Sequence, residues 1–321
     1  MIKKNTVFVL GAGASHPYGY PTGEQLLNQI SSLGLNDQFL EFLEKTTSPN
    51  EIWKDGHDQR TKFKKFVNEL EGSGLLSVDR FMVVKPEYSQ VCKYAISYIL
   101  LNAENVNKFN VAKAGDWYRY LYNNFLNDEK LEEVLENKVS FVTFNYDVSL
   151  DGFFYRAINS KYPSAAESFF KKIKVIHVHG KVRPLPWESD PRWNFPKDFS
   201  FNVSDPFQVF NLSLGIRFSF EDASKDYMSE AIDLVKSAQC VYFLGFGFHL
   251  DNVNKLEIDW DNEPRKGLKT KYIGTAFNYT SGEIVKTLND VSAFQSSGGK
   301  ILLELKPTDC LNLIKDYADK I

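Results

Sequence analysis

Cysteine is scarce in this sequence, and its absence from most of the chain excludes several kinds of site. The 321 residues contain three cysteines, Cys92, Cys240 and Cys310, and no C-x-x-C pair. This pattern argues against a disulfide framework and against a cysteine zinc site, and it fits a reducing, cytoplasmic setting. No group of histidines, cysteines and carboxylates has the spacing of metal ligands, so we predict no metal.

An excess of one charge and a long apolar run are also lacking. The formal net charge is −3, with charged residues at 25% of the chain, so a broad basic surface for nucleic acid is not expected. The nearest basic run, KKIK at 171–174, is typical of a solvated helix end. No apolar run approaches the roughly 20 residues of a membrane-spanning helix. We therefore predict neither a nucleic-acid partner nor a membrane partner.

Short apolar runs that alternate with helical patterns are present instead. They are apolar on both faces, as strands of a parallel sheet between helix layers are. The sequence predicts an α/β fold with a mostly parallel, Rossmann-like sheet and helices on both faces. The predicted strands are 7–10, 139–144, 175–178, 240–244, 272–277 and 301–305.

The interval between the first two predicted strands is too long for a single crossover helix. We interpret 25–138 as a helical insertion or cap, and 1–24 together with 139–321 as the catalytic domain. Helix-like segments in the insertion are 36–45, 60–70, 88–102, 114–125 and 129–135. A second irregular stretch, PLPWESDPRWNFPKDFSFN from Pro184, is expected to form a loop or small lobe over the sheet edge.

A glycine turn follows the first predicted strand, in VFVLGAGASH at 7–16. Such a turn lets backbone N–H groups approach a diphosphate closely. The dinucleotide motif G-x-G-x-x-G, however, needs a third glycine, and the acidic residue that follows it stands after a second strand. Neither is found here, so this motif alone leaves a structural turn and a nucleotide site equally open.

Polar residues mark the ends of the next two predicted strands. In SFVTFNYDVSLD, Thr143, Asn145 and Asp147 alternate out of an apolar run. In VIHVHGKV, strand alternation predicts that His177 and His179 share one face, with His179 at the lip.

Two aromatic residues and a second glycine pair complete the pattern. Alternation places Phe144 and Tyr146 opposite Asn145, which favours core packing for both over contact with a ligand. The fourth strand ends in VYFLGFGFHLDN, with Gly245, Gly247, Asp251 and Asn252. Ligands of open α/β sheets bind at the carboxyl ends of the strands, so we expect 11–15, Asn145, Asp147, His179 and 245–252 at one crevice.

The motifs GAGAS, TFNYD, HVHG and GFG, in this order, resemble the sirtuin family, and more closely the sirtuin-like NAD-hydrolysing domains of prokaryotic anti-phage defence systems. The resemblance extends from residue 7 to about residue 282. It implies that His179 is the catalytic histidine and that Asn145 and Asp147 lie near the nicotinamide ribose. It also implies binding of the NAD diphosphate and ribose by Ala12, Gly13 and Ser15, and of the adenosine side by Gly245, Gly247 and Thr275. We add Gly11, Thr22 and Asp251 to the predicted binding residues.

The sequence also departs from the protein-deacylating sirtuins. Their zinc lobe carries two cysteine pairs, whereas no cysteine occurs here between Cys92 and Cys240. Their G-I-P-x-F-R segment is GYPTGE here, from Gly19, without the arginine. These departures weaken peptide deacylation and leave cleavage of NAD itself as the favoured activity.

The predicted chemistry follows from the bond that is cleaved. Nicotinamide leaves NAD from a cationic ring, so the reaction needs stabilisation of an oxocarbenium-like centre and delivery of water. A neutral histidine, His179, can accept a proton near neutral pH. Asn145 can hold a ribose hydroxyl or the water, and Asp147 can orient that network or stabilise the cation.

Other functions stay open on the sequence alone. The leading hypothesis is an NAD⁺ hydrolase that depletes NAD in anti-phage defence. The alternatives are a non-catalytic module that senses NAD or ADP-ribose, and an NAD-dependent deacylase or ADP-ribosyltransferase. We expect a homo-oligomer or a regulatory partner protein that contacts 25–138. Of the other histidines, His249 is expected at the pocket rim and His57 in an exposed loop, while for His16 a phosphate contact and a surface position are equally plausible.

Overall fold

The fold is an open α/β sheet, seen in a computed structural model that describes residues 1–46, 56–110, 112–188, 203–221, 225–258, 260, 270–293 and 302–317. Within these residues, six strands, all parallel, lie in the order β3-β2-β1-β4-β5-β6, which is the Rossmann order. The prediction of a Rossmann-like sheet is therefore confirmed. The strands are β1 (Thr6–Leu10), β2 (Val139–Thr143), β3 (Val175–His177), β4 (Cys240–Leu244), β5 (Lys271–Thr275) and β6 (Leu303–Lys306).

The strand register brings the carboxyl ends of the central strands to one edge. Leu10 at the end of β1 is paired with Thr143 of β2 and with Leu244 of β4. The chain order reverses between β1 and β4, because β2 and β3 extend the sheet on one side and β5 and β6 on the other. Ligands of doubly wound folds bind at this kind of switch point.

The sheet has a hydrophobic core on each face. Phe8 packs on one side with Phe141 and Tyr242, whereas Val7 belongs to the cluster on the other side. Both faces are buried because helices cover both, which is why the strands read as continuous apolar runs.

The helices occupy most of the chain between the strands. The α-helices before β2 are α1 (Ala12–Ser15), α2 (Gly23–Leu33), α3 (Asp37–Glu44), α4 (Gly56–Gly72), α5 (Val78–Val84), α6 (Ser89–Ala103), α7 (Trp117–Phe125) and α8 (Leu131–Leu135). Those after β2 are α9 (Ser149–Lys161), α10 (Ala166–Lys172), α11 (Pro206–Ser213), α12 (Lys225–Ser237), α13 (Leu250–Lys255), α14 (Ser281–Ser292) and α15 (Cys310–Asp316). Short 3₁₀ helices are η1 (His16–Tyr18), η2 (Pro86–Tyr88) and η3 (Val106–Phe109).

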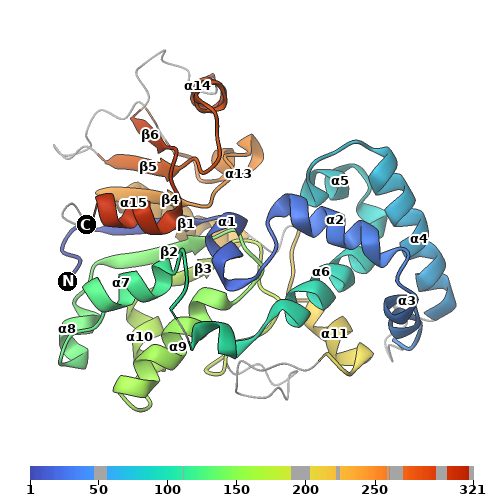
Figure 1. Cartoon of the computed structure of the whole chain (residues 1–321), viewed down its shortest axis with the longest axis horizontal. Coiled ribbons are helices and arrows are strands. Elements are labelled where there is room, and N and C mark those ends of the chain that lie inside the picture. The colour runs from blue at the N-terminus through green and yellow to red at the C-terminus, as the bar shows by residue number, and fades with distance from the viewer. Residues whose placement is uncertain are drawn as a thin grey trace.

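The helices between β1 and β2 fall into two groups (Figure 1). Helices α2, α3, α4 and α6 pack against one another, and α11 from a later part of the chain packs on α6. Helix α7 instead packs against α9 and α15, beside the sheet. The interval 25–138 is thus helical, although its last part joins the layer that covers the sheet. The boundaries of the two predicted domains stay a prediction.

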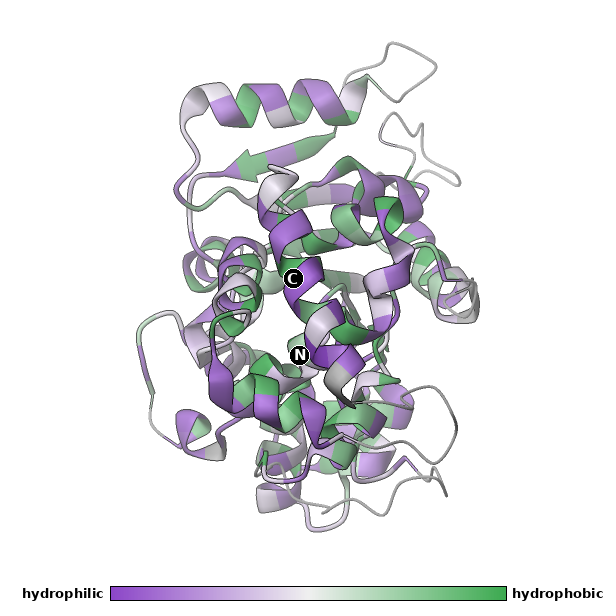
Figure 2. Cartoon of the chain, turned by 90° about the vertical axis from the view of Figure 1, so that its right-hand side faces the viewer, coloured by the Kyte–Doolittle hydropathy of each residue, from purple (hydrophilic) through white to green (hydrophobic). Residues whose placement is uncertain are grey.

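The outer helices are amphipathic, and Figure 2 shows hydrophilic and hydrophobic segments alternating along them. Among the described residues, no helix combines the length and the apolar content that a membrane crossing requires. The irregular stretch that begins at Pro184 is described only as far as Glu188, and its remainder to residue 202 lies outside the described residues, as does the side chain of His57.

Candidate active site at the carboxyl edge of the sheet

Two glycine turns meet at the switch point. The N–H of Gly11 donates to Leu244 O at 3.0 Å, and the N–H of Gly13 donates to Gly245 O at 3.0 Å. A Cβ atom on Gly11 would lie 2.6 Å from Gly245 O, and one on Gly245 would lie 2.1 Å from Ala14 N. Gly245 also has φ of +55°, in the left-handed region that favours glycine. Close packing of the two turns therefore requires these glycines even without a ligand.

Thr275, at the end of β5, supports the same contact from the side. Its hydroxyl accepts a hydrogen bond from the N–H of Gly245 at 2.8 Å, and its side chain is buried. The N–H groups of Gly11, Gly13 and Gly245 are thus all engaged within the protein. Fewer donors of these turns are available to a diphosphate than the sequence pattern suggested.

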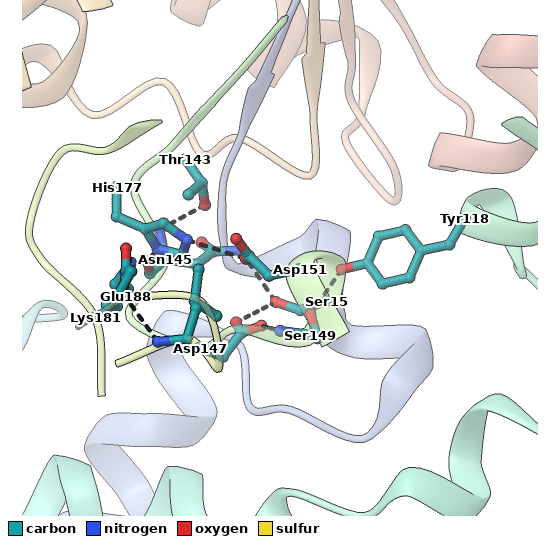
Figure 3. Close-up of polar contacts among 11 residues, drawn as sticks. Ser15, Tyr118, Thr143, Asn145, Asp147, Ser149, Asp151, His177, Lys181 and Glu188 are labelled. Carbon is teal, nitrogen blue, oxygen red and sulfur yellow. Dashed lines mark hydrogen bonds and ion pairs between the residues drawn. The ribbon is translucent and has the colours of Figure 1, made fainter. Parts of the chain in front are cut away.

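A hydrogen-bonded chain of side chains connects β1 to β2 (Figure 3). The amide Nδ2 of Asn145 donates to Ser15 Oγ at 3.0 Å, and Ser15 Oγ donates to Asp147 Oδ2 at 2.7 Å. Asn145 Nδ2 also donates to the carbonyl of Gly11 at 2.9 Å, and the N–H of Asn145 donates to Thr143 Oγ1 at 3.1 Å. The structure thereby brings together three of the predicted site residues.

The contacts of the Asn145 amide with Gly11 O and Ser15 Oγ determine the orientation of that amide. Because Gly11 O can only accept, the nitrogen of the amide must face it, and the oxygen Oδ1 faces the other way. Within the part of the chain that the structure describes, Oδ1 accepts no hydrogen bond. Asn145 is half-buried, so this oxygen is placed to accept a hydrogen bond from a ligand hydroxyl.

Asp147 is the last member of this hydrogen-bonded network, and both of its carboxylate oxygens accept hydrogen bonds. Its Oδ1 accepts a hydrogen bond from the N–H of Ser149 at 3.0 Å, and Tyr118 OH lies 2.7 Å from Ser149 Oγ. Burial raises the pKa of Asp147, and the hydrogen bonds from Ser149 and Ser15 act against that rise. With both carboxylate oxygens occupied, Asp147 orients Ser15, which in turn orients Asn145.

His177 is a buried, hydrogen-bonded residue. Its Nε2 lies 3.0 Å from Asp151 Oδ2, and its Nδ1 lies 3.3 Å from Asn145 O. Burial alone would raise the pKa of Asp151, but the charge of His177 and the hydrogen bond from its ring bring that pKa below its usual value. This pair connects β3 to helix α9.

His177 and His179 have different neighbours, contrary to the prediction that they share a face. Strand β3 ends at His177, and the chain then turns, with the N–H of Gly180 donating to His177 O at 3.1 Å. The strand alternation therefore does not extend to His179. Its imidazole lies 5.4 Å from the ring of Phe144 and 6.2 Å from the ring of Tyr146, centroid to centroid.

The imidazole of His179 is buried, with the residue 5% exposed. Burial lowers its pKa below the usual value, the carboxylate of Asp79 opposes this shift, and the ammonium of Lys255 adds to it. A side-chain hydrogen bond with Asn252 favours the protonated form. The net effect is a lowered pKa, which favours the unprotonated imidazole. In the described part of the chain its Nδ1 has no hydrogen-bond partner.

Phe144 and Tyr146 are buried, as the preference for core packing predicted, but the two rings belong to different clusters. Alternation fails here because β2 ends at Thr143. Phe144 packs edge-on against Phe246, while Tyr146 OH donates to Asp79 Oδ1 of helix α5 at 2.8 Å. Helix α5 therefore reaches the sheet beside His179.

A groove of about 400 Å³ opens beside α5, between α13 and α14. Gly247, His249 and Asp251 are among its lining residues, which agrees with the prediction of His249 at a pocket rim. Asp251 is exposed and pairs with Arg80 Nε at 3.7 Å. The acidic and basic residues of this groove are Arg80, Asp251, Glu283, Lys286 and Asp290, together with His249.

Two other predicted residues have local roles. Thr22 is the N-cap of α2, where its side chain accepts from Gln25 N, and Gln25 bonds back to form a capping box. His16 is exposed, and its Nδ1 lies 3.3 Å from Tyr20 O, beside a groove of about 320 Å³. The structure gives neither residue a contact with the network of Ser15, Asn145 and Asp147.

The sequence did not single out three residues that the structure places at this site, namely Asp79, Asp151 and Lys255. Asp151 lies on α9, within the motif SFVTFNYDVSLD, of which we considered the polar residues only up to Asp147. Asp79 and Lys255 come from α5 and α13, and nothing in their local sequences indicates a place beside His179. The described residues contain no group of three or more histidine, cysteine, aspartate and glutamate side chains placed to bind a metal ion.

Comparison with models of protein families and with curated proteins found no match to this chain. Its function is therefore argued from the site.

Proposed function

We propose that the protein is an NAD⁺ glycohydrolase that cleaves the nicotinamide–ribose bond to give nicotinamide and ADP-ribose. The observation that carries the proposal is the buried imidazole of His179 at the carboxyl edge of a Rossmann sheet, where burial lowers its pKa. The oriented amide of Asn145 at the same edge supports it. The resemblance of GAGAS, TFNYD, HVHG and GFG to sirtuin-like NAD-hydrolysing domains suggests the substrate.

The proposed reaction adds water across one bond. The bond from C1′ of the ribose to the nicotinamide nitrogen breaks, and its electron pair neutralises the pyridinium ring. His179 accepts a proton from the attacking water, whose oxygen forms the new bond to C1′, and that proton later leaves to solvent. Asn145 Oδ1 accepts a hydrogen bond from a ribose hydroxyl and so holds the sugar for attack.

Asp147 is assigned a positioning role in this scheme. It accepts the hydrogen bond of Ser15, and Ser15 accepts that of Asn145, so the amide is oriented before substrate binds. Such prior orientation lowers the reorganisation needed in the transition state.

The test is incubation of purified wild-type protein, His179→Ala and Asn145→Ala with NAD⁺, with nicotinamide and ADP-ribose followed by chromatography. We expect each variant to lose at least about 10²-fold in turnover, which is the lower end of a general base's contribution. Asn124→Ala, in the exposed face of α7, is the matched control and should keep full activity. Full activity in a folded His179→Ala protein would contradict the assignment.

The alternative of a module that binds NAD or ADP-ribose without cleaving it predicts tight binding and no turnover in wild-type protein. Deacylation is disfavoured because the sequence lacks the two cysteine pairs of the sirtuin zinc lobe. A cytoplasmic role as an anti-phage effector, held inactive by oligomerisation or by a partner protein on 25–138, rests on the resemblance alone.

A further inference from the structure

Lys255, at the end of α13, has an unusual environment for a lysine. Its Nζ atom is buried and, in the described part of the chain, has no hydrogen-bond partner. The carboxylates of Asp79 and Asp251 act on its charge, but neither forms an ion pair with it. Asp251 instead pairs with Arg80, and Asp79 accepts from Tyr146 OH.

An unpaired ammonium that is removed from water destabilises the protein that contains it. Burial accordingly lowers the pKa of Lys255. The loss is offset when a ligand supplies an anionic oxygen, because a charge-assisted hydrogen bond in a buried site is stronger than one in water. The ammonium therefore indicates a ligand with negative charge.

The imidazole of His179 supports the same interpretation. Its Nδ1 is also buried without a partner, and Lys255 contributes to the lowered pKa of His179. Two polar groups from separate elements, the turn after β3 and helix α13, are thus both incomplete and near enough to affect one another. Neighbouring unsatisfied groups of this kind mark a place for a ligand rather than a packing fault.

The glycine turn by itself provides fewer donors than a diphosphate site requires. The N–H groups of Gly11 and Gly13 donate to Leu244 O and Gly245 O, and the hydroxyl of Ser15 donates to Asp147. A cationic side chain at this edge of the sheet would add to the donors that remain and would balance part of the negative charge of a dinucleotide.

We infer that Lys255 is a phosphate-binding residue, whose ammonium binds a phosphate oxygen of the nucleotide while His179 faces the reacting sugar. This inference deepens the proposed function and rests on it for the identity of the nucleotide. The chemistry it requires is a diphosphate group, whether free or within a dinucleotide.

The experiment measures binding by calorimetry with three probes, inorganic pyrophosphate, ADP-ribose and adenosine. Wild-type protein should bind all three. Lys255→Met, which keeps the length of the side chain and removes its charge, should weaken pyrophosphate and ADP-ribose by about 10- to 100-fold, the contribution of one charge-assisted hydrogen bond. Adenosine, which has no phosphate, should bind as before. In turnover of NAD⁺ the variant should raise KM more than it lowers kcat.

Lys236→Met is the matched control, because Lys236 is an exposed lysine on α12 whose charge is already paired with Glu257, whereas the Nζ atom of Lys255 is buried. It should bind all three probes as wild type does. The melting temperature of Lys255→Met should be equal to or above that of wild type, since the substitution removes an unpaired charge. A variant that melts normally can therefore be used to judge binding.

The outcomes separate this inference from the proposed hydrolase. The inference would be overturned, even if NAD⁺ is cleaved, if wild-type protein does not bind pyrophosphate. It would also be overturned if Lys255→Met binds pyrophosphate as tightly as wild type does. An equal loss of adenosine would show a structural role and would also overturn it. Loss of the two phosphate probes alone, in a protein that does not cleave NAD⁺, would support the inference and reject the hydrolase.

Discussion

The two sides of the carboxyl edge of the sheet differ in how completely the hydrogen bonds of their polar groups are satisfied. On the side of β1 and β2, Ser15 and Asp147 are buried, and each hydrogen-bonds within the chain Asn145, Ser15, Asp147 and Ser149. On the side of β3 and α13, the Nδ1 atom of His179 and the Nζ atom of Lys255 are buried without partners in the described part of the chain.

Under the proposed function, this difference separates the groups that hold the site in place from the groups that react. A satisfied network stabilises one geometry and needs no ligand, whereas unsatisfied buried groups keep their donor and acceptor capacity for a molecule that enters. The first side thus holds the amide of Asn145 in place. The second side presents Lys255, which would bind a negatively charged group, and His179, which would accept a proton.

The largest effect is expected at the contact between the glycine turn after β1 and the glycine turn after β4. Gly245→Ala would place a Cβ atom 2.1 Å from Ala14 N, at a residue whose φ is +55°. Both turns are backbone and cannot move aside, so we expect a loss of more than about 3 kcal/mol in the free energy of unfolding. Urea unfolding followed by circular dichroism measures it.

Gly247→Ala is the control for this change. Its Cβ atom would meet only the side chain of His249, at 3.3 Å, and Gly247 is exposed. We expect a change within about 1 kcal/mol. Similar losses in the two variants would show that the close packing of the glycine turns is not the cause.

A smaller effect is expected on the satisfied side. Ser15→Ala removes one partner from Asp147 Oδ2 and one from Asn145 Nδ2, and both groups lie at buried or half-buried positions. The expected loss of stability is about 1–3 kcal/mol, the usual effect of leaving a buried polar group unsatisfied. Thermal and urea unfolding give the value.

Ser32→Ala in α2 is the matched substitution, because Ser32 is exposed and its hydroxyl bonds only to Asn28 O. It should leave stability nearly unchanged. If Ser15→Ala lowers the free energy of unfolding no more than Ser32→Ala does, the network of Asn145, Ser15 and Asp147 does not stabilise the fold.

The smallest effect concerns two carboxylates, Asp147 and Asp151, whose pKa values shift in opposite directions. The folded-state pKa of Asp151 is lowered, so its contribution is present above the unfolded value of about 3.9 and is lost as the pH falls through the folded value. The folded-state pKa of Asp147 is raised, so burial of its charge destabilises the protein at neutral pH, and this cost disappears as the pH falls toward about 4.

Urea unfolding of wild type, Asp147→Asn and Asp151→Asn measures both slopes between about pH 3 and 6, from about one unit below to about two units above the unfolded value. The stability of wild type relative to Asp151→Asn should shrink as the pH falls, while its stability relative to Asp147→Asn should grow. Slopes of the same sign would contradict the opposed environments. Only slopes are compared, so a constant effect of the amide cancels.

Much of the fold could be predicted because its signals are local. Each of the six apolar runs overlaps an observed strand, and each helix-like segment predicted within 25–138 overlaps an observed helix. The prediction failed where it extended a local rule past the end of its element. Strand alternation was applied to His179, although β3 ends at His177, and to Tyr146, although β2 ends at Thr143.

The sequence could indicate which residues follow the strands, but not which hydrogen bonds they form. The residues that follow β1, β2, β3 and β4 meet because parallel strands end at one edge. Which atoms remain unsatisfied there depends on partners from elsewhere, such as Asp79 on α5 for Tyr146 and Asn252 on α13 for His179.

The sequence by itself determined which segments are strands and helices and which polar side chains stand at the strand ends, because hydrophobic period and turn chemistry act over a few residues. Only the tertiary structure decided the contact between the two glycine turns, the bond of Ser15 to Asp147 across 132 residues, and the burial of Lys255 Nζ without a hydrogen-bond partner among the described residues. Those features arise from packing between distant segments, and no local pattern encodes which distant group, if any, a buried side chain will meet.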